Sequence, residues 1–190
     1  TFDDLNAVSK IVQSDKKANF KLMNNISGEG QKLLQTIGSA SNPYEGTFDG
    51  QGYDIFNLSI ENADGDTALF GTVGTNGIVK RVNVFYHHVT GKRAAGIAAV
   101  NDGVIENSFS RGKVFAGTTD THAVRMARIA GAIAGGIAGQ NTANGTIHNV
   151  YSVNDAVSAT NAGAIFGEND GGSVSQTYFL NSLPGGAEQG

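Results

Sequence analysis

A four-residue pattern of small, apolar, apolar and small residues recurs along this chain and limits its fold more than any other feature. The copies of this quartet are Ala68–Gly71, Gly96–Ala99, Gly136–Gly139 and Ala164–Gly167. Their first residues are separated by 28, 40 and 28 positions. Self-similarity at intervals of about 20–50 residues is typical of repeat proteins, in which each unit buries its apolar face against the next. The sequence therefore predicts a solenoid.

A second pattern follows each quartet and begins with an aliphatic residue. Its members are Ile55, which precedes the first quartet, and then Val79, Ile105, Ile147 and Val174. The successive intervals are 24, 26, 42 and 27 residues. Because stacked coils lie about 4.8 Å apart, equal positions in successive coils become neighbours. We expect these five side chains to form one buried aliphatic column.

Each full repeat contains three short apolar segments, the third of which lies around Val89, Val114 and Val157. Three strands in 24–28 residues are typical of a parallel β-helix, and the general preference of parallel crossovers favours the right-handed form. The patterns of leucine-rich, helical and hexapeptide repeats are absent. The predicted fold is all-β, a right-handed parallel β-helix with three short strands per coil.

Polar and glycine positions recur at the same intervals. Two residues after the aliphatic position come Asn57, Arg81, Asn107, Asn149 and Gln176. Stacked amides can hydrogen-bond to one another, so the three asparagines predict a structural ladder. Just before the aliphatic position come Asn76-Gly77, Asp102-Gly103, Asn144-Gly145 and Gly171-Gly172. Such dipeptides favour positive φ, which we expect at the corners between strands.

The N-terminus departs from the repeat and carries a helix signal. Thr1 and Asp4 resemble a capping box, and Leu5, Val8 and Val12 fall on one helical face. These residues predict an amphipathic helix over roughly residues 2–13. Since a solenoid has an open apolar end, we expect this helix to act as its N-terminal cap.

The remaining boundaries follow from composition and spacing. Residues 20–26 alternate as a strand would, and residues 27–46 resemble a long loop. We expect a cap over residues 1–45, the β-helix repeats over 46–181 and a linker or tail over 182–190.

One repeat is about 12 residues longer than the others, which predicts an insertion at about 117–134. Residues 123–134 are rich in Ala, Met and Ile and predict a short helix. Loops on a rigid scaffold commonly bind partners. This insertion carries His122, Arg125 and Arg128, and no Lys or Arg occurs after Arg128. These three residues are the candidate binding site. The alternative is a tolerated excursion from the solenoid surface.

The quartets resemble the GLUG motif (Gly-Leu-hydrophobic-Gly), and residues 47–58 resemble the segment that precedes it. Gly136–Gly139 matches best, whereas Ala replaces Gly at positions 68, 99 and 164. GLUG repeats are found in large bacterial surface and secreted proteins, including adhesin-like proteins and the N-terminal regions of immunoglobulin A1-specific metallopeptidases. The resemblance implies extracellular display or attachment to a host glycan or protein, and a longer parent chain with other domains. It transfers no catalytic residue.

Charge and composition exclude several classes of partner. Lys and Arg total 13 against 17 acidic residues, so we expect no binding to nucleic acid. No stretch approaches 18 consecutive apolar residues, and we expect no insertion into a membrane. The chain contains no cysteine, which excludes disulfides and thiolate metal sites. We expect neither a metal nor another cofactor.

The motifs of zinc peptidases, serine hydrolases and phosphate-binding loops are absent. Parallel β-helices also support polysaccharide lyases and glycosidases, which need clustered carboxylates, or a base beside acids, on an exposed sheet. The residues that could supply such a cluster are Asp49, Asp54, Asp102, Glu106, Arg111 and Lys113. We favour a non-catalytic module for adhesion or spacing, and a carbohydrate-active enzyme is the alternative.

Two further polar groups favour a structural interpretation. His87 and His88 lie on a strand without a third convergent ligand for a metal, so we expect an exposed histidine. Asn62, Asp64 and Asp66 resemble the start of a calcium loop but lack the Gly and Glu that complete such loops. We interpret residues 62–66 as a polar loop.

Overall fold

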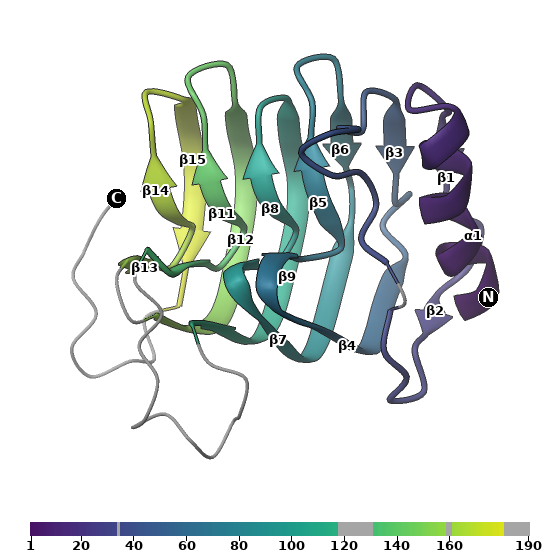
Figure 1. The fold of residues 1–190 in the computed structure, drawn as a ribbon, viewed down its shortest axis with the longest axis horizontal. Coiled ribbons are helices and arrows are strands. Elements are labelled where there is room, and N and C mark those ends of the chain that lie inside the picture. The colour runs from purple at the N-terminus through teal and green to yellow at the C-terminus, as the bar shows by residue number, and fades with distance from the viewer. Residues whose placement is uncertain (34, 118–130, 159–160, 181–190) are drawn as a thin grey trace.

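The chain folds into stacked parallel β-coils. A computed structural model describes residues 1–33, 35–117, 131–158 and 161–180. In these residues the protein is a parallel β-solenoid of about 5 turns with a single N-terminal helix (Figure 1). The predicted all-β solenoid with an N-terminal helix is thereby confirmed.

One helix and a series of strands make up the described chain. They are α1 (Phe2–Ser14), β1 (Phe20–Lys21), β2 (Ile26–Ser27), β3 (Thr47–Asp49), β4 (Asp54–Thr67), β5 (Phe70–Val73), β6 (Ile78–Lys80), β7 (Asn83–Ala95), β8 (Ala98–Asn101), β9 (Val104–Ala116), β10 (Ile133–Gly135), β11 (Ala138–Asn141), β12 (Thr146–Ser158), β13 (Asn161–Gly163), β14 (Phe166–Asn169) and β15 (Ser173–Phe179). Four of them form a separate sheet in the order β14-β11-β8-β5, and the others belong to an 11-stranded sheet. The four-stranded sheet forms one flat side of the solenoid.

The division of each coil into strands differs from the expected three short segments. In β9 and β12 the aliphatic segment and the third segment form one strand of 13 residues. Asn107 and Asn149 have φ values of 50° and 49°, which turn these strands from one side of the coil to the next. Asparagine tolerates this left-handed conformation, so the strand bends without leaving the ladder.

The aliphatic column is confirmed except at its first position. The register partners in successive coils are Val79, Ile105, Ile147 and Val174. Ile55 was assigned wrongly, because Phe48 pairs with Val79 whereas Ile55 pairs with Val84. A turn in which the Tyr53 N–H donates to the Gly50 carbonyl separates β3 from β4 and moves Ile55 to the next side of the coil. Asn57 was misplaced for the same reason.

The third segment is confirmed in part. Val89 pairs with Val114, as expected. The next partner of Val114 is Ala156, and Val157 pairs with Phe115 instead. The assignment of Val157 was therefore wrong by one residue, which reverses the side of the strand that a residue faces.

The quartets stack as predicted, and their small residues have two different uses. The third positions are register partners: Phe70, Ala98, Ala138 and Phe166. The last position lies beneath side chains that cross the outer face, since a Cβ on Gly139 would lie 2.7 Å from Cγ of Arg93. A Cβ on Gly167 would likewise overlap Cγ2 of Ile133. The small residue therefore makes room for outer side chains of the neighbouring strand.

The corner glycines are needed for close stacking. Of the eight dipeptide residues, only Gly171 has a positive φ, which is 90°. A Cβ on Gly103 would overlap the Gly77 carbonyl oxygen, and one on Gly145 would overlap the Asn101 carbonyl oxygen. The expectation of positive φ at Asn76, Asp102 and Asn144 was wrong. Glycine is needed in these dipeptides because the backbone of the preceding coil leaves no room for a Cβ.

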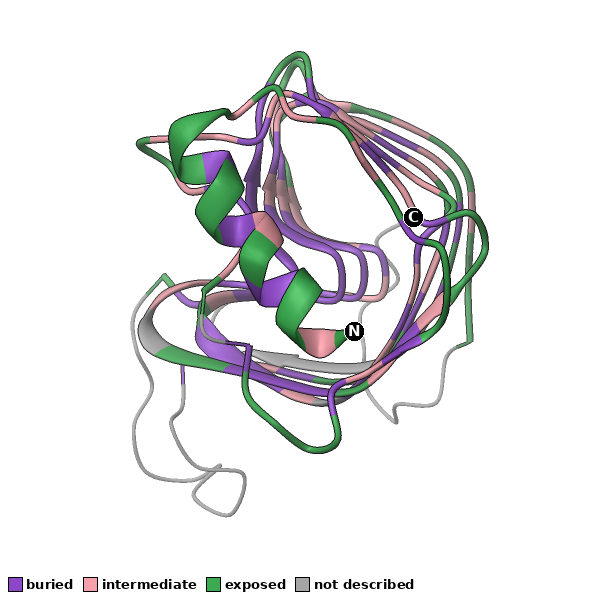
Figure 2. Ribbon diagram, turned by 90° about the vertical axis from the view of Figure 1, so that its right-hand side faces the viewer, coloured by how far each residue is buried: buried purple, intermediate pink, exposed green. Residues whose placement is uncertain are grey.

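The N-terminal helix matches its prediction. Thr1 and Asp4 form the capping box, in which the Asp4 N–H donates to Thr1 Oγ1 at 3.2 Å. Leu5 and Val12 are buried, and α1 lies against the N-terminal end of the solenoid (Figure 2). The helix also accepts a hydrogen bond of 2.8 Å from the Asn42 side chain at the Val12 carbonyl.

Residues 20–44, expected as a strand and a loop, follow the path of an irregular first coil. Phe20 pairs with Phe48 and Ile26 with Ile55. The segment expected as a loop adds single bridges, among them Ile37 with Phe70. Backbone pairing thus reaches the N-terminal region even where no regular strand forms.

The long repeat interrupts this ladder at one place. The Gly117 N–H still donates to the Gly91 carbonyl at 2.9 Å. The ladder resumes at Ile133–Gly135, which is β10 and pairs with β7 and β13. Ile133 and Ala134 therefore lie in a strand, and the helix expected over them was wrong. Gly131 and Ala132 are not helical either, and residues 123–130 of that expected helix lie outside the described residues.

Candidate functional site

The residues predicted to bind a partner cannot be placed. His122, Arg125 and Arg128 lie outside the described residues. Their role stays a prediction. The described chain offers other polar groups, which the following paragraphs take in turn.

The exposed asparagine ladder is confirmed for two of its members. Asn149 Nδ2 donates to Asn107 Oδ1 at 2.7 Å, and both side chains are exposed. Asn57 lies elsewhere, at a shift in the register between β4 and β7. This ladder sits where the strands bend and serves the fold.

A second asparagine ladder, buried inside the solenoid, was missed. Asn101 Nδ2 donates to Asn141 Oδ1 at 2.9 Å, and Asn141 Nδ2 donates to Asn169 Oδ1 at 3.0 Å. Asn101 and Asn141 are 0% exposed. The signal was present in the sequence, since each of these asparagines stands five residues after the start of a quartet.

The carboxylates of the enzyme hypothesis connect neighbouring coils. Arg81 forms a bidentate ion pair with Asp49 and thereby lowers the pKa of that carboxyl to about 2. The Asn83 side chain donates to Asp54 Oδ1 at 3.1 Å. Asp102 accepts from Thr142 and, at 3.0 Å, from Asn144. These contacts give each of the three aspartates a structural role.

The remaining candidates of that hypothesis show no comparable contacts. Glu106 is partly exposed, and its charge adds to the effect of Asp49, whose hydrogen bond is the main cause of the raised pKa of Arg81. Arg111 and Lys113 are exposed on β9. Across the described ranges, no three histidine, aspartate or glutamate side chains come together as a metal would require.

His88 belongs to a polar group with Glu61 and Lys32. Its Nε2 lies 2.5 Å from Glu61 Oε1, and Lys32 pairs with the other oxygen of the same carboxyl. Both contacts lower the pKa of Glu61, that of Lys32 more strongly. The side chain of His87 lies outside what the structure describes.

The polar segment 62–66 is a bulge in β4. Asn62 pairs with Gly91 and Asp66 with Arg93, so the β4 side of this pairing holds two extra residues. Asp66 Oδ1 lies 3.6 Å from Arg93 Nη1. The side chain of Asp64 is not among those described, and binding of calcium stays untested.

An aromatic column runs along another outer face. The rings of Phe109 and Tyr151 are stacked with centroids 5.8 Å apart, and Phe85 lies 5.2 Å from Phe109. Tyr178 is the next register partner of Tyr151. Tyr151 is 41% exposed and Tyr178 56%, so the column is most accessible towards its C-terminal end.

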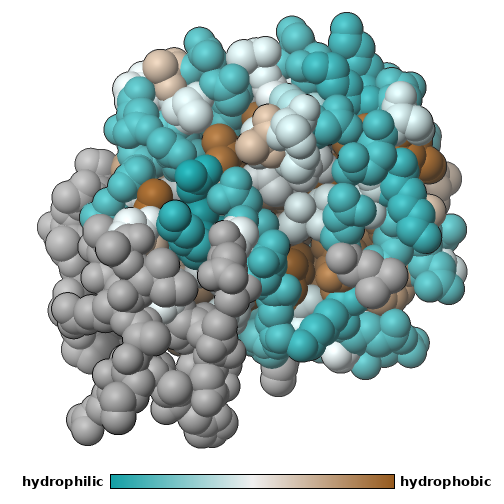
Figure 3. Space-filling view, in the orientation of Figure 1, coloured by the Kyte–Doolittle hydropathy of each residue, from teal (hydrophilic) through white to brown (hydrophobic). Residues whose placement is uncertain are grey.

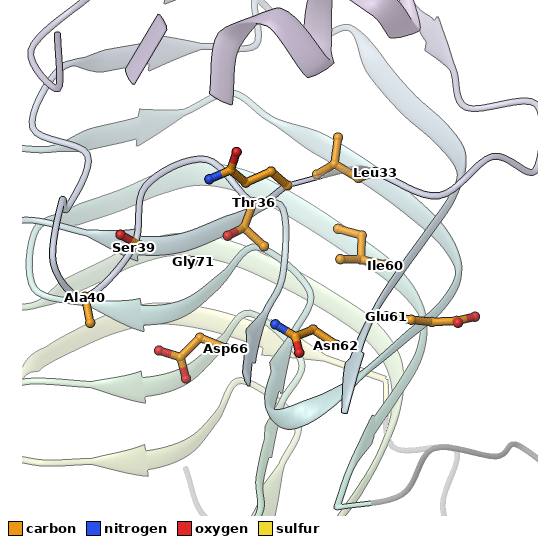
Figure 4. Close-up of a pocket in the computed structure, with 10 residues that line it drawn as sticks. Leu33, Thr36, Ser39, Ala40, Ile60, Glu61, Asn62, Asp66 and Gly71 are labelled. Carbon is orange, nitrogen blue, oxygen red and sulfur yellow. The ribbon is translucent and has the colours of Figure 1, made fainter. Parts of the chain in front are cut away.

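Two cavities flank the segment 39–43 of the irregular first coil. The larger one measures about 510 Å³ (Figure 4) and includes Thr36, Ser39, Ala40, Glu61, Asn62 and Asp66 in its lining. The smaller one measures about 380 Å³ and includes Ala40, Glu45, Thr72, Arg93, Asp102 and Thr142 in its lining. Thr72 and Arg93, which line the smaller cavity, each have a buried polar atom without a hydrogen-bond partner, Oγ1 and Nε respectively.

The visible surface on this side is mainly hydrophilic, with small separated hydrophobic areas (Figure 3). None of the described helices is long and apolar enough to cross a membrane. We take the two cavities as the candidate site on the described part of the chain, and sequence reasoning did not find them.

Comparison with known proteins gives partial similarities. No family model matches the chain, and no solved structure matches it. Halomucin of Haloquadratum walsbyi is 32% identical over 89 residues, which cover 46% of this chain and 1% of that protein. A putative Gly-rich membrane protein of Evansella cellulosilytica is 33% identical over 78 residues, which cover 38% of this chain and 9% of that protein. The aligned parts thus span less than a tenth of either relative.

Proposed function

We propose that this chain is a non-catalytic repeat module of an extracellular or cell-surface protein. It either attaches that protein to a host surface or acts as a structural spacer between other domains. The observation that carries the proposal is the use of polar side chains along the solenoid axis. Carboxylates and amides that could form a reactive cluster instead join one coil to the next, as Asp49 does to Arg81 and Asn141 to Asn101.

The comparisons support the cellular setting. One partial relative is named Halomucin, and the other is named a putative Gly-rich membrane protein. The resemblance to GLUG repeats points in the same direction, towards bacterial surface and secreted proteins. We propose accordingly that other domains of a longer parent chain flank this module, and that any peptidase activity resides in them.

Location can be tested on intact cells that produce the parent protein. A protease added outside should release peptides of this chain, while peptides of a cytoplasmic marker stay protected. Release only after lysis would overturn the proposed location.

The absence of catalysis needs a separate test. The purified chain should leave a panel of polysaccharides uncut, measured by the release of reducing ends and of unsaturated products. Turnover that Asp49→Asn or Asp102→Asn abolishes would establish the enzyme alternative. A parallel screen against glycans and host proteins distinguishes attachment, which requires a ligand, from spacing, which does not.

A further inference from the structure

We propose that the two cavities beside the segment 39–43 form one groove that binds a neutral oligosaccharide. This groove is lined by the residues given above for the 510 Å³ and 380 Å³ cavities. The inference deepens the proposed attachment role and rests on it, because it supplies the site and the chemical class of the ligand.

The floor of the smaller cavity is built by the repeat. Thr72 on β5 and Val100 on β8 are register partners and both line the cavity. Arg93 comes from the end of β7, and its stem lies over Gly139, whose missing side chain leaves the space. The small last residue of a quartet thus permits a long polar side chain to lie along the outer face of the sheet.

Two residues that line this cavity carry unpaired polar groups. Thr72 is only 8% exposed, yet its hydroxyl has no hydrogen-bond partner. Arg93 Nε is also buried and unpaired, and its nearest ion-pair contact, Nη1 to Asp66 at 3.6 Å, is too long for a good hydrogen bond. Buried polar groups are nearly always paired in folded proteins. If ligand binding turns both side chains into the cavity, a ligand oxygen that accepts from Arg93 and a ligand hydroxyl that pairs with Thr72 would complete both groups.

The charges around the groove select against an anionic ligand. Arg93 faces Asp66, and Glu45 is paired with Lys16 at 2.9 Å. Asp102 has neutral partners only among its described hydrogen bonds. The carboxylates therefore outnumber the cations, and a uronate or sulfated sugar would be repelled. Sugar hydroxyls both donate and accept, which matches a lining of hydroxyls, carboxylates and one guanidinium.

The shape indicates more than one sugar unit. Ala40 lines both cavities, so the two are adjacent beneath the segment 39–43. In the larger cavity, Thr36 and Ser39 lie across from Asn62 and Asp66 (Figure 4). Both volumes fall within the range of about 300–1,000 Å³ that small-molecule sites occupy.

The test is a titration of the ¹⁵N-labelled chain with cellotetraose, mannotetraose and tetra-N-acetylchitotetraose, and with tetragalacturonate as the anionic comparison. At least one neutral tetrasaccharide should shift the backbone signals of Thr72 and Gly71 and the Arg93 Nε–H signal. Thr72→Val should weaken binding about 2- to 10-fold and Arg93→Gln more than about 10-fold, because each removes one hydrogen-bonding group. Thr72→Ser, which keeps the hydroxyl, should bind nearly as the parent does.

Lys92→Gln is the matched control, since Lys92 is the exposed neighbour of Arg93 on β7 and lines neither cavity. It should bind like the parent chain. Thermal unfolding of every variant verifies that the fold is kept, and Arg93→Gln carries the test alone if Thr72→Val unfolds.

Three results would overturn the inference: no neutral tetrasaccharide binds, binding is equal in Arg93→Gln and Lys92→Gln, or only tetragalacturonate binds. A loss of binding in the groove variants together with cleavage of the sugar would support the groove while overturning the non-catalytic function.

Discussion

At its N-terminal end the solenoid is covered by α1 and filled with aromatic rings, whereas at its C-terminal end the stacked columns stop on exposed side chains. The N-terminal rings, Phe20, Tyr44, Phe48 and Phe70, have neighbouring centroids 5.3–6.5 Å apart. At the other end β15 pairs only with β12 among the described strands, and Tyr178 and Leu180 are each 56% exposed.

This difference shows that equivalent positions in a repeat do not contribute equally to stability. A residue inside the stack contacts a coil on each side, but a residue in the last coil contacts only one. Val79 is 0% exposed, whereas Val174 in the same column is partly exposed. In a solenoid, stability is approximately the sum of each repeat and its interfaces with its neighbours. Matched substitutions along one column can therefore measure the interface terms separately.

The largest expected effect concerns the covered end. Deletion of residues 1–18 removes the buried side chains of Leu5 and Val12 and exposes the coil beneath. We expect a loss of about 3–6 kcal/mol in unfolding free energy from these two side chains, and end-to-end association of the exposed coils. Urea unfolding and light scattering measure the two effects.

Point variants of the helix provide the control for that deletion. Val12→Asp should reproduce the association, while Ile11→Asp should not, because Ile11 is 44% exposed. A truncated chain that stays monomeric with unchanged melting would show that α1 is an appendage and not a cap.

The next effect compares the middle of the aliphatic column with its end. Ile147→Ala should cost about 2–5 kcal/mol, through lost burial and an unfilled cavity between coils. Val79→Ala should lower the unfolding free energy by about 1.5–3 kcal/mol. Val174→Ala should lower it by less than about 1 kcal/mol, although both substitutions replace Val by Ala. Chemical denaturation of the three variants measures the series. Equal losses at Val79 and Val174 would mean that the last coil is covered as well as the inner ones.

The buried asparagine ladder allows the same comparison with polar groups. Asn141 accepts from Asn101 and donates to Asn169, while Asn169 is exposed at the end of the ladder. Asn141→Ala should cost about 1–3 kcal/mol because it leaves polar atoms of Asn101 buried and poorly paired. Asn169→Ala should cost less than about 1 kcal/mol, since water can replace the lost partner. A larger loss at Asn169 than at Asn141 in denaturation curves would contradict this account.

The regular coils could be predicted because their constraints repeat in the sequence. The quartets at positions 96 and 136 and the column from Val79 to Val174 keep near-constant spacing on either side of one insertion. Ile55 failed because the corner before it holds a turn that the later coils lack. The buried ladder was missed because Val73 occupies its place in the first quartet repeat and hides the period.

The groove could not be predicted, since it depends on contacts that no periodicity encodes. Arg93 reaches across the sheet to Gly139. It lines one cavity together with Thr72, which belongs to a different coil from Arg93. The segment 39–43, which contributes lining residues to both cavities, lies in the irregular first coil, where the sequence shows no repeat. The N-terminal end, which deviates most from the pattern, thus carries both the cover and the candidate site.

The smallest expected effect is electrostatic and also belongs to the N-terminal half. The hydrogen bonds from Arg81 lower the pKa of Asp49 to about 2, below the value of about 3.9 expected in an unfolded chain. The pair therefore stabilises the fold above about pH 4, and this contribution is lost as the pH falls from about 4 to about 2. Because the Arg81 side chain is 49% exposed, screening by solvent limits the gain to about 1 kcal/mol or less. Unfolding free energies measured between these pH values should fall more steeply for the parent chain than for Asp49→Asn or Arg81→Gln. Identical slopes in the three proteins would show that the ion pair contributes nothing measurable, and that backbone pairing and packing join β3 to β6 without it.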